Sequence, residues 1–193
     1  AACRRLSRVS AAGSERAALD RPAVIGTLTA PVAAGPVGRW DRAATLEVEA
    51  PGGAFASLTE MQVLSGGNRL LLETAEGWEL VQFSAATLTG AETWRLSGLL
   101  RGQEGSPASA AQAGARIVLL DGADALPAIS PGEFGAEMIW RAAGLHETQA
   151  LAFSDAGGLP WPVCHLRAVD GTLSWVRRGA DLPESWALPE GAN

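Results

Sequence analysis

The spacing of the reactive side chains (cysteine, histidine, serine and the carboxylates) does not predict a catalytic site. Cys164 and His165 are neighbours in an apolar stretch typical of a β-strand, and neighbouring side chains of a strand point to opposite faces. A thiolate and an imidazole placed in this way do not converge as a nucleophile and its base. The second histidine, His146, lies in a polar, loop-like segment. We expect both histidines to be structural.

The serines and the carboxylates predict no reactive centre either. No serine stands in the Gly-x-Ser-x-Gly elbow of many hydrolases. Asp121 and Asp124 flank a glycine but lack the acidic spacing of a calcium loop. Glu133 and Glu137 would meet only on a helix, and nearby glycines disfavour a helix there. We therefore expect no catalytic residue, no cofactor and no metal, and we expect that this segment is not an enzyme.

The composition argues against two classes of partner. The chain of 193 residues carries a net charge of −6, whereas binding to a nucleic-acid backbone rests on a clustered positive surface. The basic group Arg4, Arg5 and Arg8 is short and typical of a solvated tail. No apolar run reaches the ~18 residues of a helical membrane span. We expect no nucleic-acid partner and no membrane span.

Short apolar segments separated by turn residues predict a mainly β fold. Strands joined at close intervals by Gly-rich turns are typical of an antiparallel barrel or sandwich. One short helix is predicted at Pro107–Ala113, with Ser106 as its N-cap, and Gly13–Leu19 suggests a helical turn. The strands are predicted at Val24–Ala30, Ala44–Ala50, Glu60–Ser65, Arg69–Thr74, Trp78–Phe83, Ala85–Thr89, Thr93–Leu100, Ala115–Asp121, Gly135–Arg141, Gln149–Phe153, Val163–Ala168 and Thr172–Arg177.

The predicted organisation has three parts. Residues 1–22 form an N-terminal arm or linker that ends at Arg21-Pro22, and residues 23–155 form the all-β domain. Residues 156–193 form either the start of a fibronectin type III-like unit, with Trp175 facing inward, or a C-terminal extension whose strands pair with the main domain. Cys3 and Cys164 are compatible with a disulfide but do not require one. The first residue, Ala1 rather than Met, indicates a piece of a longer polypeptide.

The most specific motif lies in Thr93–Gly105, with the pattern Trp-Arg-Leu-Ser-x-Leu-Leu-Arg-Gly-Gln-x-Gly. Its alternation predicts a strand with one face in a core and an irregularity at Gly98. Further motifs are Leu19-Asp20-Arg21-Pro22, Gly35-Pro36, Arg39-Trp40-Asp41-Arg42, Val63-Leu64-x-Gly-x-Asn68, Gly77–Phe83, Gly114–Asp121, Pro162-Val163-x-His165-Leu166-Arg167-Ala168 and Ser174–Arg178. In this order the motifs resemble the C-terminal part of the large tail-tip or baseplate hub proteins of gene transfer agents and related siphophage-like tails.

This resemblance implies a structural role in the tail of a phage-like particle that is assembled in the bacterial cytoplasm. The family's long hub protein has an upstream TIM-barrel-like domain similar to glycoside hydrolases, but none of the matched motifs lies there. The resemblance also implies a homotrimer, contacts with distal tail and hub subunits, and a part in host-cell attachment or envelope penetration.

The resemblance implies that five residues of the matched motifs have a structural role as scaffold. They are Trp94, Leu96, Leu100, Arg101 and Gly102. We expect Arg101 to brace a turn carbonyl or an acidic neighbour. Reversal of its charge is then expected to destabilise the domain.

An alternative function is a carbohydrate- or receptor-binding β-domain. Trp161 and Trp186 stand beside prolines in loop-like segments, and Trp40 is a third candidate. Exposed indole rings at such positions stack on sugar rings or contact subunits, and a cell-surface glycan is the partner in that case. Packing in the core or against loops is the other interpretation of these residues.

Overall fold

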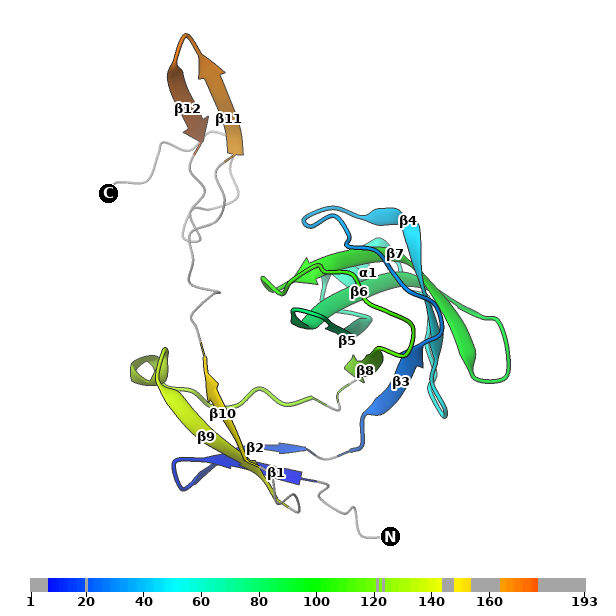
Figure 1. The fold of residues 1–193 in the computed structure, drawn as a ribbon, viewed down its shortest axis with the longest axis vertical. Helices are drawn as coiled ribbons and strands as arrows, with labels where there is room; N and C mark the ends of the chain where they lie inside the picture. The colour runs from blue at the N-terminus through cyan, green and yellow to red at the C-terminus, as the bar shows by residue number, and fades with distance from the viewer. Residues whose placement is uncertain are drawn as a thin grey trace. The chain divides into compact units, whose positions relative to one another are not determined.

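The computed structural model describes residues 7–19, 21–120, 122, 124–143, 148–153 and 164–176. These residues are mainly in strands, with one short α-helix, as the sequence predicts. The chain divides into two compact units, Ala1–Ser154 and Asp155–Asn193. The first unit holds a barrel and a separate four-stranded sheet, and the second holds a two-stranded sheet (Figure 1).

Six strands of the first unit close into an antiparallel barrel. Around the barrel their order is β3-β4-β7-β6-β5-β8, and β8 pairs back onto β3. Closure pairs both sides of every strand, so the barrel has no free sheet edge. The strands are β3 (Val24–Leu28), β4 (Asp41–Glu49), β5 (Arg69–Thr74), β6 (Gly77–Leu88), β7 (Thr93–Gln103) and β8 (Arg116–Leu120).

Apolar side chains from all six strands fill the barrel. On β4, Leu46 and Val48 are buried while Glu47 and Glu49 are not, as the alternation in the sequence predicts. Small barrels have an interior just wide enough for side chains to fill. The barrel is therefore a packed core, and its other central members are Leu28, Leu70, Leu72, Val81, Phe83, Leu96, Leu99, Ile117 and Leu119.

The irregularity predicted at Gly98 is confirmed. Gly98 has φ +62°, and a Cβ there would lie 2.0 Å from Oγ of Ser84. The register of the neighbouring β4 also shifts here, between Asp41 and Thr45. The irregularity changes the alternation of β7, which allows both Leu96 and Leu99 to join the core although they are an odd number of positions apart.

The short helix lies in a different segment from the predicted one. Residues Glu60–Leu64 form α1, where a strand was predicted. Thr59 and Gln62 form a capping box at its N-terminus. The Thr59 N–H donates to Oε1 of Gln62, and the Gln62 N–H donates to Oγ1 of Thr59. This Thr-x-x-Gln capping box was present in the sequence, and it explains why the prediction of a strand at Glu60–Ser65 was wrong.

The prediction of a helix at Pro107–Ala113 was also wrong. Ala111 instead forms an isolated bridge with Val32, with an N–H···O bond of 2.9 Å in each direction. The hydroxyl of Ser106, the expected N-cap, accepts from the Leu80 N–H at 2.8 Å and donates to the Gln103 carbonyl at 2.7 Å. The segment is therefore not helical, because polar groups in and beside it bond to other parts of the chain.

Four further strands form the separate sheet, in the order β10-β9-β1-β2. They are β1 (Ser7–Ala11), β2 (Ser14–Leu19), β9 (Glu137–Ala142) and β10 (Thr148–Ala152). All neighbours are antiparallel. The helical turn suggested at Gly13–Leu19 was wrong, because Ala12 and Gly13 adopt the positive φ values of a two-residue hairpin turn.

Arg16 ties this sheet to the segment that leads into β9. Its guanidinium bonds both carboxylate oxygens of Glu133, at 3.1 and 2.6 Å, and the Ala128 carbonyl at 3.0 Å. Glu133 lies in a short 3₁₀ turn, η1 (Pro131–Glu133), and also accepts from the Ser130 N–H. These bonds fix the η1 segment against the sheet.

The second unit is described only for one hairpin. Its strands are β11 (Cys164–Val169) and β12 (Thr172–Val176), joined by a turn at Asp170-Gly171. The two strands pair with each other. The side chain of Trp175 lies outside the described part, so the fibronectin-like anchor stays a prediction.

Candidate functional sites

A fully buried ion pair joins two neighbouring strands of the barrel, β6 and β7. Glu79 on β6 shares, by alternation, the inward face of Val81 and Phe83. Arg101 on β7 donates to it twice, from Nε to Oε1 at 2.6 Å and from Nη2 to Oε2 at 2.7 Å. Both side chains are 0% exposed. Two parallel hydrogen bonds from the planar guanidinium to the carboxylate fix the distance and the relative orientation of the two groups, in addition to pairing their charges.

The same pair holds two loops against the strands. Arg101 donates from Nη1 to the Ala33 carbonyl at 3.1 Å and from Nη2 to the Ser109 carbonyl at 2.8 Å. Glu79 accepts a further bond, from the backbone N–H of Gly102 at 2.9 Å. The prediction that Arg101 braces a turn carbonyl or an acidic neighbour is confirmed, and it does both.

Two glycines leave the room that this network needs. A Cβ on Gly35 would lie 2.7 Å from Cγ of Arg101. A Cβ on Gly102 would lie 2.9 Å from Cγ2 of Val37, and Gly102 has φ +61°. Gly35, Glu79, Arg101 and Gly102 come from three separate motifs of the sequence, and the fold brings them to one place. We call these four residues the buried network.

The remaining scaffold residues also lie in the barrel. Leu96 and Leu100 are buried, and Trp94 is half-buried with its ring 5.5 Å from that of Phe55. Glu79 was not predicted as the partner of Arg101. The available signal was a charged residue on the inward face of an apolar strand, a position that requires a buried partner.

A second candidate site is a cleft of about 800 Å³ in the first unit. Its residues come from the four-stranded sheet, from the 124–136 segment and from the barrel. They include the aromatic residues Trp78, Trp140 and Phe153 together with Gln149 and Arg116. Clefts of ~300–1,000 Å³ are the usual size of small-molecule sites.

Trp140 is the most unusual residue of this cleft. Its side chain is buried, and its ring packs edge-on against Phe153 at 5.2 Å. The indole Nε1 is fully buried and has no hydrogen-bond partner among the described residues. Burial removes the water that would bond such an N–H. When no other acceptor replaces that hydrogen bond, the folded state loses free energy of stabilisation.

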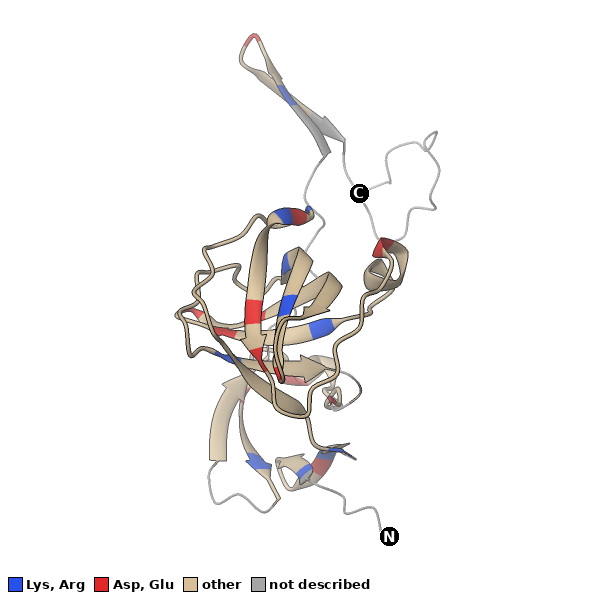
Figure 2. Ribbon diagram, turned by 90° about the vertical axis from the view of Figure 1, so that its right-hand side faces the viewer, with Lys and Arg blue, Asp and Glu red and all other residues tan. Residues whose placement is uncertain are grey.

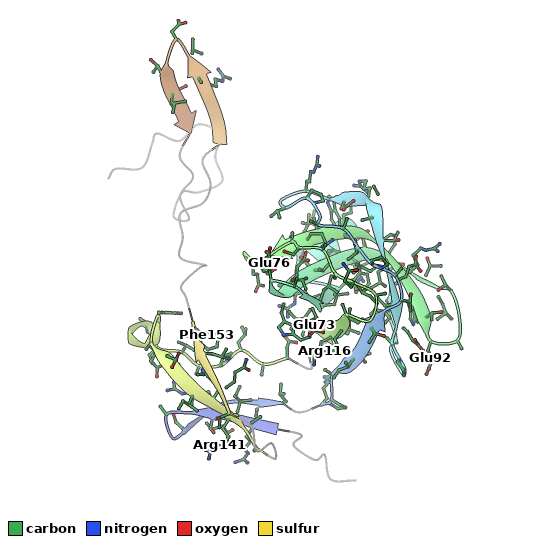
Figure 3. The ribbon with its side chains drawn as sticks, viewed as in Figure 1. Glu73, Glu76, Glu92, Arg116, Arg141 and Phe153 are labelled. Atoms are coloured by element: carbon green, nitrogen blue, oxygen red, sulfur yellow. The ribbon has the colours of Figure 1, made fainter. Side chains whose placement is uncertain are left out.

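On the barrel side of the cleft, Trp78 stands beside a surface ion pair. The guanidinium carbon of Arg116 lies 5.3 Å from the centre of the Trp78 ring. Arg116 also donates to both oxygens of Glu73, at 2.9 and 2.8 Å, and Figure 3 shows the two side chains next to each other. Hydrogen bonds from the Arg116 side chain and then from its backbone lower the pKa of Glu73 to about 2. The same pairing raises the pKa of Arg116.

Of the three tryptophans predicted for binding, Trp40 is the one that the structure describes, and it is not among the residues that line the cleft. Trp161 and Trp186 lie outside the described residues. Trp40 is half-buried, with the Arg42 guanidinium carbon 5.9 Å from its ring centre. Trp78 and Trp140 were not singled out, because nothing in a linear sequence indicates that β6 and β9 contribute to one cleft.

Two of the carboxylates considered in the sequence, Asp124 and Glu133, make ion pairs. Asp124 accepts from Arg69 at 3.0 Å, and Glu133 from Arg16. The Arg16 side chain and the Ser130 N–H lower the pKa of Glu133. Asp121, His146 and the side chains of Cys164 and His165 lie outside the described part. Within the described residues there is no group of three His, Cys, Asp or Glu side chains that could hold a metal.

No helix in the described part of the chain has the length and apolar character needed to cross a membrane. Figure 2 marks arginines and acidic residues as separate segments, interspersed along the ribbon of the barrel.

Together these features define a small, closed β-barrel module with a packed interior and an internal ion pair. Residues 23–118 match the family model described as "Rcc01698-like, C-terminal". The match begins one residue before β3 and ends within β8, so it spans the barrel and the whole buried network. The comparison with curated proteins gave no match.

Proposed function

We propose that this chain is a structural part of a phage-like tail tip or baseplate of the gene transfer agent kind. In that role it contributes to hub assembly and to host-cell attachment or envelope penetration. The ordered sequence motifs and the match of the barrel to the Rcc01698-like C-terminal family model support this proposal.

The observation that carries the proposal is the placement of the motif residues. Gly35, Glu79, Arg101 and Gly102 are devoted to one buried contact inside the barrel. A buried, hydrogen-bonded charge pair specifies a geometry and offers no group to a substrate. Motifs of this kind suit a module whose task is to hold its shape while other proteins assemble on it.

The expected partners are other copies of the chain in a homotrimer, together with distal tail and hub subunits. The expected location is the tail of the particle. Both expectations follow from the sequence resemblance, and both are open to one experiment.

The experiment is immunogold labelling and cryo-electron microscopy of particles from the producing cells, with an antibody against residues 23–118. We expect label at the tail tip with threefold symmetry. An antibody against the major tail-tube protein serves as the control for labelling along the tail. Recovery of the antigen only as a free monomer near 19.9 kDa would refute the proposal.

A second candidate function is carbohydrate binding. The observation that favours it is the aromatic cleft, because the partly exposed Trp78 lines it and aromatic rings contact the flat apolar faces of sugars.

A further inference from the structure

The two edges of the four-stranded sheet differ in how they are covered. β2 forms one edge, and its Arg16 carbonyl accepts from the backbone N–H of Ala128 at 3.1 Å, so the 124–136 segment lies against it. β10 forms the other edge, and all five of its residues are exposed. Among the described residues, no main-chain hydrogen bond reaches β10 from any strand except β9. The outer side of β10 therefore presents unpaired N–H and C=O groups.

β10 also lacks the features that keep other strands away from a sheet edge. Such features are charged side chains, proline and β-bulges. β10 contains no charged residue and no proline, and its register with β9 continues without a shift. β2, by comparison, carries Glu15 and Arg16 and has a register shift against β1. β10 is thus open to a further strand, which binds to such an edge by main-chain hydrogen bonds.

The side chains on the sheet face opposite to Trp140 indicate which strand fits this edge. We call this the outer face. On β9 its residues are exposed, and Ile139 is 64% exposed. Directly paired residues of β9 and β10 share a face. The outer face therefore has three rows of paired residues, which are Arg141 with Thr148, Ile139 with Ala150, and Glu137 with Ala152.

We propose that β10 pairs with β10 of a second copy of this chain. The two strands run antiparallel about a two-fold axis perpendicular to the sheet, and Ala150 of one copy lies opposite Ala150 of the other. This register pairs all five residues of β10, since Gln149 then lies opposite Leu151, and Thr148 opposite Ala152. The two four-stranded sheets become one continuous sheet.

The charges of the outer face favour this arrangement. It brings Arg141 of one copy and Glu137 of the other into the same row, with their Cα atoms about 14 Å apart across three strand spacings. The residues between them, Thr148 and Ala152, are small, so the two long side chains can extend over them toward each other. A parallel arrangement would instead place Arg141 in a row with Arg141, and Glu137 with Glu137, and like charges repel.

This contact goes beyond the proposed function. A pair of five-residue strands buries less than the ~1,200 Å² below which interfaces are weak and transient, so we expect reversible pairing. A two-fold contact cannot lie within a closed ring of three copies. Where such a ring forms, the β10 contact joins two rings. Tail-tip labelling reports on the particle, whereas this contact is measured on the isolated chain.

The test is analytical ultracentrifugation of the full chain from about 10 µM to about 1 mM, the range in which a weak interface dissociates. The chain has a mass of 19.9 kDa. We expect a species of twice that mass to increase with concentration, or a pair of rings if rings of three also form. Amide hydrogen exchange at the two ends of this range locates the contact. Protection should rise with concentration in β10 and not in β2.

Charge variants at the axis then identify the second copy as the occupant. Ala150→Lys and Ala150→Glu each place two like charges directly opposite each other, so each should weaken the pairing by about 10-fold or more. An equimolar mixture of the two variants should restore the pairing, because each lysine then lies opposite a glutamate. Ala91→Lys and Ala91→Glu are the matched controls, since Ala91 is exposed in the loop between β6 and β7. They should change the affinity by less than about 2-fold.

Three results would overturn the proposal. The first is a wild-type chain that shows no paired species up to about 1 mM, which would leave β10 to a strand of a different protein. The second is an Ala150→Lys variant that pairs as the wild type does. The third is a mixture that pairs no better than either variant alone. Ala150 is exposed, so both variants should keep the wild-type melting temperature. The hydrogen exchange of the wild type tests the contact without any substitution.

Discussion

The barrel and the four-stranded sheet satisfy their polar groups in different ways. In the barrel, even a fully buried charge has several partners: Arg101 bonds Glu79 and two loop carbonyls. In the sheet, the buried indole of Trp140 has no described partner, and β10 is exposed along its whole length. Within the described residues, the buried charges of the barrel are therefore fully paired, whereas the sheet contains a buried donor without a partner.

The largest expected effect concerns the buried network. Arg101→Glu places two carboxylates together without a cation, and Arg101→Met leaves Glu79 buried and unpaired. We expect either variant to lower the free energy of unfolding by at least about 3–5 kcal/mol. Chemical denaturation followed by Trp fluorescence measures this loss.

The control for this prediction is Arg95→Met on the same strand. Arg95 also pairs with a glutamate, Glu47, but its side chain is 55% exposed, so we expect a loss of no more than about 1 kcal/mol. An unchanged melting temperature for Arg101→Glu would reject the bracing role. So would equal losses for Arg101→Met and Arg95→Met.

A smaller loss is expected for Gly102→Ala. Alanine is disfavoured at φ +61°, and its Cβ would press on Val37, which together should cost about 1–3 kcal/mol. Gly105→Ala is the matched control, with φ +77° but open space around its Cβ. The backbone cost alone is about 1–2 kcal/mol. Thermal melts that give the two variants equal stability would show that close packing at Gly102 contributes nothing.

The sheet has its own arginine anchor, and removing it should matter less than removing Arg101. The Arg16 side chain is 13% exposed and holds Glu133 and the Ala128 carbonyl. We expect Arg16→Met to cost about 1–2 kcal/mol. Amide hydrogen exchange should increase in the sheet and not in the barrel.

The comparison for this variant is Arg8→Met, since the Arg8–Glu15 pair is about half exposed on both sides. A cost near zero is expected there. Faster exchange in β6 or β7 after Arg16→Met would contradict the separation of sheet and barrel.

The smallest expected effect is a dependence on pH at the barrel surface. The pKa of Glu73 is lowered from 4.5 to about 2 by Arg116. A lowered carboxyl pKa contributes stability that is complete above the unfolded pKa. This contribution should be lost as the pH falls from about 4.5 through about 2.

Carboxyl-carbon NMR titration measures the Glu73 pKa directly. Glu73→Gln should remove this part of the acid dependence while leaving that of Glu133. Titration of Glu73 near its ordinary value in the native protein would contradict the Arg116 contact.

The strands were predictable because their signal is local. Leu46 and Val48 alternate with glutamates over a few residues, and the two-residue period alone indicates which side faces the core. The position of the helix was not predicted, although its Thr59–Gln62 capping box is a local signal. At Pro107–Ala113 the local helix signals were real, but bonds to distant strands outweighed them.

The two candidate sites show why side-chain partners are harder to predict than strands. Arg101 could be recognised as a residue that needs a partner, but its pairing with Glu79 depends on the register of β6 and β7. That register contains a shift between Leu80 and Gln82, which the sequence does not reveal. The cleft is more difficult still, because Trp78 and Trp140 line it from strands that are not neighbours in a sheet.

The pairing that closes the barrel has a consequence for the construction of longer chains. Val24 at the start of β3 lies opposite Leu119 near the end of β8, so the chain enters and leaves the barrel at adjacent points. The strands before it, β1 and β2, and those after it, β9 and β10, belong to one sheet. The barrel is thus an inserted domain, placed in the chain between the two halves of the four-stranded sheet. An inserted domain whose ends are adjacent can be exchanged between related proteins without moving the sequences that flank it.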